Sequence, residues 1–221
     1  MSHPGDTRRL VRDGYDRASY AYRGDTCDLE SSGYGHWLRR LGLRVPDGAR
    51  VLDLGCGCGV PATQEMAKRW RVTGVDLSPV QVERARALVP GATFVRADMG
   101  EVAFEPGSFD AVVAFYSIIN LPVDEQPALF GRIASWLAPG GWFMGVVGKY
   151  SRTAVEEDFR GVKGVSMYWS HADLLDYRRW IAAAGLEIVE EGSQPLTSPT
   201  GYAVVIARRR EGVPASEGGA R

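Results

Sequence analysis

Long apolar runs, excess charge of one sign and cysteine are all scarce in this sequence of 221 residues. No apolar stretch approaches the roughly 20 residues that a membrane-spanning helix needs, so we expect no membrane association. The 26 basic and 27 acidic side chains leave a net charge of −1, which argues against a nucleic-acid partner. The opening Met-Ser-His-Pro-Gly-Asp has no apolar signal region, and we expect a cytoplasmic protein.

The three cysteines, Cys27, Cys56 and Cys58, do not suit a metal site. A structural zinc ion takes four ligands, usually from two C-x₂₋₄-C pairs, whereas this chain has one C-x-C and no second pair. An odd number of cysteines without a secretion signal predicts free thiols in a reducing compartment. We therefore expect no bound metal.

Glycine, by contrast, is concentrated in one informative stretch. Residues 51–59 read Val-Leu-Asp-Leu-Gly-Cys-Gly-Cys-Gly, an apolar strand that runs into a glycine turn, and a helical pattern follows. Gly55, Gly57 and Gly59 allow positive φ angles and close approach of a ligand to the backbone. The spacing is G-x-G-x-G, whereas the dinucleotide fingerprint is G-x-G-x-x-G. Asp53 would repel a pyrophosphate in the turn but would attract an ammonium or a sulfonium group.

Two more predicted strands also end in an acid. Residues 72–76 end in Asp76, at the distance where a carboxylate can accept hydrogen bonds from both hydroxyls of a ribose. Residues 93–99 end in Asp98 and Met99, an acceptor and an apolar side chain that suit the amine and the face of an adenine. A glycine turn that served only to reverse the chain would not explain three acids at strand ends.

Together these motifs resemble those of class I S-adenosylmethionine-dependent methyltransferases, in particular bacterial enzymes that act on small molecules. The resemblance covers about the middle half of the chain, in the order and spacing of that family. The segments that carry it are VLDLGCGCG (51–59), VTGVDLSPVQVERAR (72–86), FVRADM (94–99), FDAVVAFYSIINLP (109–122) and LAPGGWF (137–143).

The resemblance implies an α/β fold, a Rossmann-like doubly wound sheet of seven strands with a reversed last strand and an N-terminal helical cap. The alternation of strand and helix patterns agrees with this fold. We expect the cap at 1–46, the methyltransferase domain at 47–210 with a lid insertion at about 149–170, and a disordered tail at 211–221. Helices are predicted over 8–22 and 28–41.

A further helix is predicted to begin at the lid. Ser170-x-x-Asp173 reads as a capping box that opens a helix ending at about Ala184.

The resemblance also implies S-adenosylmethionine as the cofactor, with S-adenosylhomocysteine as the product. By resemblance, Asp53 and the backbone of the glycine turn hold the amino-acid end of the cofactor. Tyr22 follows Tyr15-Asp16 at helical spacing and is expected to touch the methionine moiety, and Phe115 is expected to border the methyl group.

The adenosine end has its own expected contacts. Asp76 is expected to bind the ribose hydroxyls, with Leu77 under the adenine. Asp98 and Met99 are expected to flank the base.

A methyl group on a sulfonium is already activated, so the protein mainly has to orient the acceptor. His171 is the best candidate for a general base, because its pKa suits proton transfer near neutral pH and it follows the aromatic stretch Met167–Ser170. The alternative is that His171 occupies the first turn of a helix and faces solvent. Tyr116 and Tyr168 are candidates for shaping or hydrogen-bonding the substrate.

The sequence narrows the class of methyl acceptor only by excluding some substrates. The (N/D)-P-P-(Y/F) motif of enzymes that methylate DNA bases is missing, since Ala114-Phe115-Tyr116-Ser117 stands at that place. We expect a small, partly apolar metabolite as the acceptor and a monomer or a homodimer as the assembly. Two alternatives stay open: a cyclisation or rearrangement beside a bound sulfonium, and binding of another nucleotide, as in a dehydrogenase.

Overall fold

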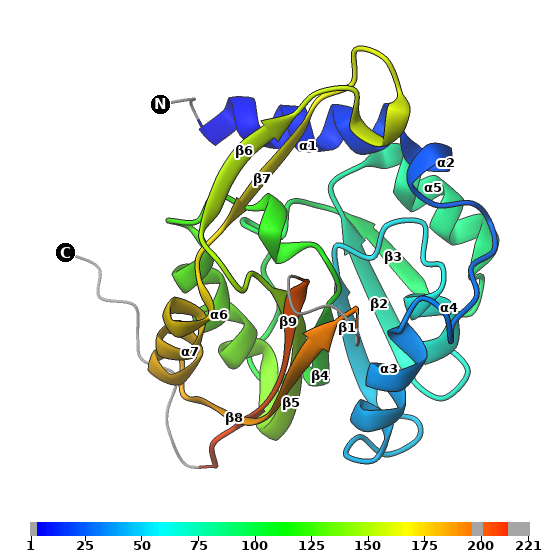
Figure 1. Cartoon of the computed structure of the whole chain (residues 1–221). Coiled ribbons are helices and arrows are strands. Elements are labelled where there is room, and N and C mark those ends of the chain that lie inside the picture. Colours follow the sequence, from blue (N-terminus) through cyan, green and yellow to red (C-terminus); the bar gives the residue numbers. More distant parts are fainter. Residues whose placement is uncertain (1–3, 196–200, 212–221) are drawn as a thin grey trace.

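The computed structural model describes residues 4–195 and 201–211, and within them a sheet of seven strands has the order β3-β2-β1-β4-β5-β9-β8 (Figure 1). The last strand, β9, runs antiparallel to β5 and β8, and the pairs from β3 to β5 are parallel. This order confirms the predicted Rossmann-like sheet with a reversed strand. The strands are β1 (Arg50–Leu54), β2 (Arg71–Asp76), β3 (Thr93–Arg96), β4 (Phe109–Ala114), β5 (Leu137–Val147), β8 (Leu186–Gln194) and β9 (Tyr202–Arg209).

Helices cover both faces of the sheet, because successive apolar side chains of a strand point to opposite faces. Val51 packs in one core with Trp37, whereas Leu52 packs in another with Phe130. The helices of the first face are α3 (Tyr34–Gly42), α4 (Ala62–Met66) and α5 (Pro79–Leu88), and those of the second are α6 (Gln126–Trp136) and α7 (Leu174–Ala183) (Figure 1). In the described part of the chain, no helix combines the length and apolarity that crossing a membrane requires.

The N-terminal segment forms two helices where the sequence predicted one over 8–22. These are α1 (Pro4–Arg17) and α2 (Ser19–Tyr22). Asp16 ties α1 to the start of α5, since its carboxylate accepts a hydrogen bond from Ser78 Oγ at 2.5 Å and Ser78 is the N-cap of α5. The cap therefore has a polar anchor beside the end of β2.

The predicted lid is a two-stranded antiparallel sheet that projects from the main sheet toward α1 (Figure 1). Its strands are β6 (Arg152–Glu156) and β7 (Met167–His171), and a short 3₁₀ helix, η2 (Phe159–Gly161), lies at the tip. We call residues 152–171 the arm. The arm and α1 together cover one edge of the sheet.

Phe159 fastens the tip of the arm to the cap. Its side chain is 1% exposed and belongs to a small core of its own with Val11, Ala18, Val165 and Met167. Three aromatic rings surround it at centroid distances of 5.8 to 6.0 Å; these belong to Tyr15, Tyr22 and Trp169. The cap and the arm thus share a core that is separate from the two cores of the main sheet.

Two predicted helix starts were wrong. Ser170 lies in β7, where its Oγ accepts a hydrogen bond from the backbone N–H of Val123 at 3.1 Å, and α7 begins only after Asp173, which is its true N-cap. Pairing of Met167–His171 with the distant β6 overrides the local capping pattern. The alternative for His171, a solvent-facing helical turn, is therefore also wrong.

The helix expected over 28–41 begins at Tyr34. Asp28 holds the preceding residues in a turn, because its carboxylate accepts hydrogen bonds from the backbone N–H groups of Glu30 and Ser31. In the predicted tail at 211–221, residues 212–221 lie outside the described residues.

We expect Phe159→Ala to release the arm from the cap without unfolding the main sheet. Removing a buried phenylalanine costs roughly 3 to 5 kcal/mol, and here the cost falls on the small shared core. Hydrogen exchange should accelerate by about a hundredfold or more in residues 152–171, with no comparable change in β1 and β4. Equal acceleration in the arm and the main sheet would contradict this. Phe130→Ala, in the main core, is the control that should lower global stability.

Candidate functional site

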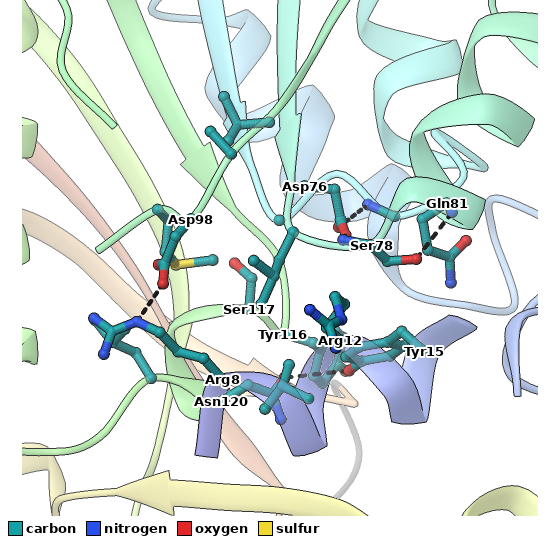
Figure 2. Close-up of a pocket in the computed structure, with 18 of the residues that line it drawn as sticks. Arg8, Arg12, Tyr15, Asp76, Ser78, Gln81, Asp98, Tyr116, Ser117 and Asn120 are labelled. Atoms are coloured by element: carbon teal, nitrogen blue, oxygen red, sulfur yellow. Dashed lines mark hydrogen bonds and ion pairs between the residues drawn. The ribbon is translucent and has the colours of Figure 1, made fainter. Parts of the chain in front are cut away.

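The order of the strands places a cavity at one edge of the sheet. Between β1 and β4 the order of parallel strands reverses, and ligands of such folds bind beyond the carboxyl ends of the strands at this point. A cavity of about 730 Å³, partly open to solvent, lies there between the sheet and α1 (Figure 2). Its lining includes Arg8, Tyr15, Tyr22, Gly55, Gly57, Asp76, Leu77, Gln81, Asp98, Met99, Phe115, Tyr116, Ser117 and Asn120.

The glycine turn forms the floor of this cavity. Gly55 has φ = 71°, and a Cβ there would lie 2.2 Å from Cβ of Ser117, so no larger residue fits. The Gly57 N–H donates a hydrogen bond of 2.8 Å to Asp76 Oδ2, which joins the turn to the end of β2. Gly59, the third glycine, lines neither this cavity nor its neighbour and packs instead against Val89.

Asp53 lies in a second cavity, of about 380 Å³, that shares Tyr22, Gly55, Gly57 and Phe115 with the first. Its side chain is 1% exposed and accepts a hydrogen bond of 2.6 Å from Thr63 Oγ1. Burial raises the pKa of Asp53 to about 7, and the charge of Asp76 acts in the same direction. A carboxylate in such a place is stabilised by a cationic ligand.

Arg23 lines the same second cavity. Its guanidinium lies 5.7 Å from the ring centroids of both Tyr22 and Tyr34 and donates a hydrogen bond to Cys27 Sγ. Among the described residues it forms no ion pair with a carboxylate. This second cavity therefore offers a carboxyl group and a guanidinium cation at one end of the site.

Asp76 is fixed from two sides. Besides the bond from Gly57, its Oδ1 accepts a hydrogen bond of 2.9 Å from the Ser78 N–H. Burial raises the pKa of Asp76 to about 6, against the opposing effect of these backbone donors. Beside it, Gln81 Nε2 is buried and has no hydrogen-bond partner in the described structure. A ligand with hydroxyl groups would satisfy both side chains.

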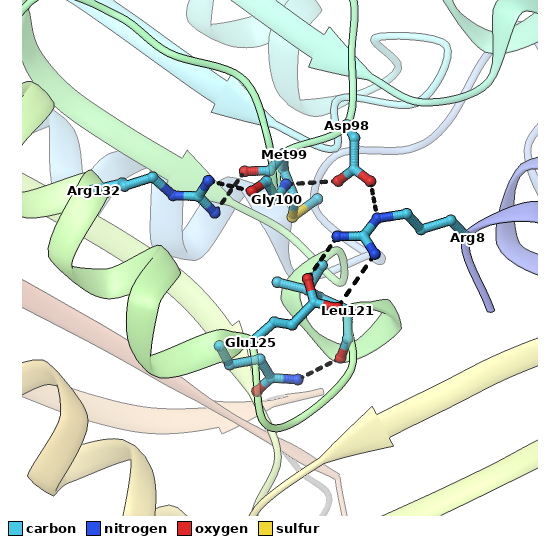
Figure 3. A network of polar contacts seen from close by, with 8 residues as sticks. Arg8, Asp98, Met99, Gly100, Leu121, Glu125 and Arg132 are labelled. Carbon is cyan, nitrogen blue, oxygen red and sulfur yellow. Dashed lines mark hydrogen bonds and ion pairs between the residues drawn. The ribbon is translucent and has the colours of Figure 1, made fainter. Parts of the chain in front are cut away.

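Asp98 is held by a polar network that also closes the cavity (Figure 3). Its Oδ1 accepts a hydrogen bond of 2.6 Å from the Gly100 N–H, and its Oδ2 pairs with Arg8 Nε. The same guanidinium pairs with Glu125 at 2.6 Å, just before α6. Arg8 thereby holds the start of α1 over the ends of β3 and β4.

The remaining wall is aromatic and polar. Tyr15 donates a hydrogen bond of 3.2 Å to Asn120 Oδ1, and Asn120 Nδ2 donates one of 2.8 Å to the Tyr168 carbonyl, so α1, the loop after β4 and the arm are connected. Tyr116 has φ = 55°, a strained conformation for a bulky residue that often marks a functional position. Burial raises the pKa of Tyr116 to about 12.

His171 and Tyr168 do not line the cavity. His171 is 8% exposed, and its ring lies 5.8 Å from that of Tyr202, which in turn lies 5.5 Å from Tyr116. Burial lowers the pKa of His171, which favours the neutral imidazole near pH 7. Tyr168, on β7, packs against the shared core of arm and cap. Of the three catalytic candidates, only Tyr116 borders the cavity directly.

Several lining residues were not predicted from the sequence, among them Arg8, Gln81 and Ser117. Gln81 carries a weak signal, since it stands three residues after the N-cap Ser78 and its backbone N–H is the capped group. Arg8 carries none. Within the part of the chain that the structure describes, no group of three or more His, Cys, Asp or Glu side chains could hold a metal ion.

Residues 51–141 match a family model described as a methyltransferase domain. The match begins in β1 and ends in β5, so it contains the glycine turn and the three acids that surround the two cavities. The chain carries a class I methyltransferase domain.

Curated relatives of this domain include two methyltransferases of different substrates. The sterol 24-C-methyltransferase of Clavispora lusitaniae is 32% identical over 130 residues, which are 55% of this chain and 34% of that protein. The trans-aconitate 2-methyltransferase of Paracidovorax citrulli is 40% identical over 104 residues, which are 44% of this chain and 39% of that protein. The chain thus spans little more than a third of the length of these relatives.

Solved structures share the fold over nearly the whole chain. One is the 1,6-didemethyltoxoflavin-N1-methyltransferase of Burkholderia thailandensis with S-adenosylhomocysteine bound, at a TM-score of 0.70 and 20% identity, covering 96% of this chain and 92% of that one. Another is the [4+2]-cyclase SpnF, at a TM-score of 0.71 and 20% identity, covering 93% and 97%. At these identities the likeness establishes the fold.

The buried acid of the methyltransferase domain predicts a pH dependence of stability. An unfolded aspartate ionises near pH 4, whereas Asp53 in the folded chain keeps its proton up to about pH 7. Between these values the folded state binds more protons than the unfolded state, so this group makes the free energy of unfolding fall as pH rises.

We expect Asp53→Asn, which cannot ionise, to reduce that fall between pH 5 and pH 8 by at least about 1 kcal/mol. Urea unfolding of the ligand-free protein at the two pH values measures it. Asp47→Asn, at an exposed carboxylate near the start of β1, is the control that should keep the wild-type slope. Identical slopes in wild type and Asp53→Asn would show that Asp53 ionises normally.

Proposed function

We propose that the chain binds S-adenosylmethionine and transfers its methyl group to a nucleophilic atom of a small, partly apolar metabolite. The observation that carries this proposal is the convergence of Asp53, Asp76 and Asp98 with the glycine turn around two joined cavities. Each part of the cofactor has a chemically suited partner there. The family match and the fold support the same conclusion.

At the amino-acid end, the Asp53 carboxylate suits the ammonium group and the Arg23 guanidinium suits the carboxylate. The two side chains line one cavity, and Arg23 pairs with no carboxylate in the described part of the chain. The glycine turn allows the backbone to approach the ligand closely. Binding of an ammonium would favour ionised Asp53, so cofactor affinity should rise with pH up to about 7.

At the adenosine end, Asp76 and Gln81 Nε2, which has no hydrogen-bond partner among the described residues, suit the two ribose hydroxyls. Leu77 and Met99 supply apolar contacts for the base. Asp98 already accepts bonds from Gly100 and Arg8, and each carboxylate oxygen can accept a second hydrogen bond, from the adenine amine. Arg8 would then hold α1 closed over the bound base.

The cofactor supplies a methyl group that is already activated, so the residues around it contribute position and a dry environment. Tyr22 and Phe115 border both cavities and so lie where the amino-acid and adenosine ends of the ligand meet. Tyr116, next to Phe115, faces the acceptor. We propose His171 as the general base, which would take the proton of an acceptor that extends from Tyr116 past Tyr202 to the imidazole.

The function is tested by incubating the protein with methyl-deuterated S-adenosylmethionine and a bacterial metabolite extract, followed by mass spectrometry. A labelled small molecule that is missing when heat-inactivated protein is used supports methyl transfer and identifies the acceptor. An unlabelled new product that depends on the cofactor would instead support the alternative, a cyclisation or rearrangement that leaves the methyl in place.

We expect Asp76→Ala to weaken S-adenosylmethionine binding by roughly 1.5 to 3 kcal/mol, because hydrogen bonds from the ribose to a charged acceptor are lost. Isothermal titration calorimetry measures the affinity, with Asp47→Ala as the control at the opposite edge of the sheet. Unchanged affinity for S-adenosylmethionine in Asp76→Ala would contradict the proposal that Asp76 binds the ribose hydroxyls.

We expect His171→Ala to lower kcat by more than about tenfold while cofactor affinity stays within about twofold, because a general base acts in the chemical step. The rise of kcat with pH near the His171 pKa should also disappear in the variant. A variant with full kcat and an unchanged pH profile would leave His171 as a packing residue beside Tyr202.

A further inference from the structure

Two arginines on the arm, Arg152 and Arg160, have no acidic partner among the residues that the structure describes. In residues 4–195 and 201–211, most arginines form an ion pair with Asp or Glu or donate to a backbone carbonyl, as Arg8, Arg84 and Arg178 do. Arg152 and Arg160 are exposed and form no ion pair with a carboxylate in this part of the chain. Their guanidinium groups are therefore available to a ligand.

Arg160 lies directly over the wall of the proposed cofactor site. Its guanidinium is 5.4 Å from the ring centroid of Tyr22, which borders both cavities, and 5.6 Å from that of Phe159. Arg160 has φ = 56°, a strained conformation that persists only where the surroundings enforce it. The buried Phe159 side chain next to it fixes the tip, so the strained backbone holds Arg160 over Tyr22.

Arg152 reaches the same region from the base of the arm. It pairs across the strands with His171, and residues directly opposite one another share a face of a two-stranded sheet. The rings of His171, Tyr202 and Tyr116 follow one another at 5.8 and 5.5 Å, and Tyr116 lines the cofactor cavity. Arg152 thus stands at the outer end of an aromatic row that leads to the cavity.

The charges that act on Tyr202, the middle ring of this row, are mainly positive. Burial raises the pKa of Tyr202, Arg152 and Arg160 both act in the opposite direction, and Glu156 is the one acid that acts with burial. The Glu156 carboxylate is already engaged, because it accepts a hydrogen bond of 2.8 Å from Trp169 Nε1. The charges that act on Tyr202 are therefore those of two arginines and of one acid that is already engaged with Trp169.

We propose that the acceptor carries a carboxylate or a comparable anionic group, bound by Arg152 and Arg160, with its flat apolar part against Tyr116 and Tyr202. This inference rests on the proposed methyltransferase function and names the substrate class of that site. Guanidinium groups bind carboxylates through paired, charge-assisted hydrogen bonds. An anionic acceptor also complements the positive sulfonium beside which it must lie.

The test compares two probes that differ in charge and hardly in shape, 4-hydroxybenzoate and 4-hydroxybenzamide. Each is titrated by ligand-observed NMR into protein saturated with S-adenosylhomocysteine. We expect the carboxylate to bind at least about tenfold more tightly than the amide, as charge-assisted hydrogen bonds imply. Arg152→Gln and Arg160→Gln should each remove most of this preference, whereas Arg71→Gln, at an exposed arginine at the start of β2, should keep it.

Equal affinity for the two probes, binding of neither at about 10 mM, or an unchanged preference in both arm variants would overturn the proposal. Affinity for S-adenosylhomocysteine is measured in every variant and should stay within about twofold of wild type. Absence of the carboxylate preference in wild-type protein that binds S-adenosylhomocysteine would contradict only the substrate class. Failure of wild-type protein to bind S-adenosylhomocysteine would contradict the proposed function itself.

Discussion

The burial of carboxylates at one edge of a parallel sheet is the constraint on which the site depends. Chain direction alone brings the ends of β1, β2 and β3 together, and each end supplies an aspartate. Desolvation raises the pKa of Asp53 to about 7 and that of Asp76 to about 6, so the ligand-free site holds acids in an unfavourable state. A ligand with an ammonium group and two hydroxyls relieves both. The Asp98 carboxylate already has a cationic partner within the protein, the guanidinium of Arg8.

The same arginine shows how the cap and the site are coupled. Arg8 bridges Asp98 and Glu125, Asp16 caps α5 through Ser78, and Phe159 joins the arm to the cap. None of these contacts belongs to the two cores of the main sheet, so we expect the sheet to stay folded when they are lost. A site that has to exclude water during methyl transfer and still exchange its ligands needs a cover of this kind.

The positions of the three acids and of the glycine turn could be predicted because each depends on local strand pattern and chain order. An insertion at about 149–170 could also be predicted, but its strands could not, because β7 is a strand only through its pairing with β6, and the local Ser170-x-x-Asp173 pattern favours a helix start. Arg8 was out of reach for a similar reason, since 90 residues separate it from Asp98. His171 was identified as a residue of interest, but its distance from the cavity follows from the packing of Tyr202.

The most direct test of the account is a pair of calorimetric titrations of the wild-type protein, one with S-adenosylmethionine and one with NADH. The account predicts that one S-adenosylmethionine binds per chain and that NADH does not, because Asp53 and the G-x-G-x-G turn suit an ammonium and exclude a pyrophosphate. Binding of NADH without binding of S-adenosylmethionine would contradict it.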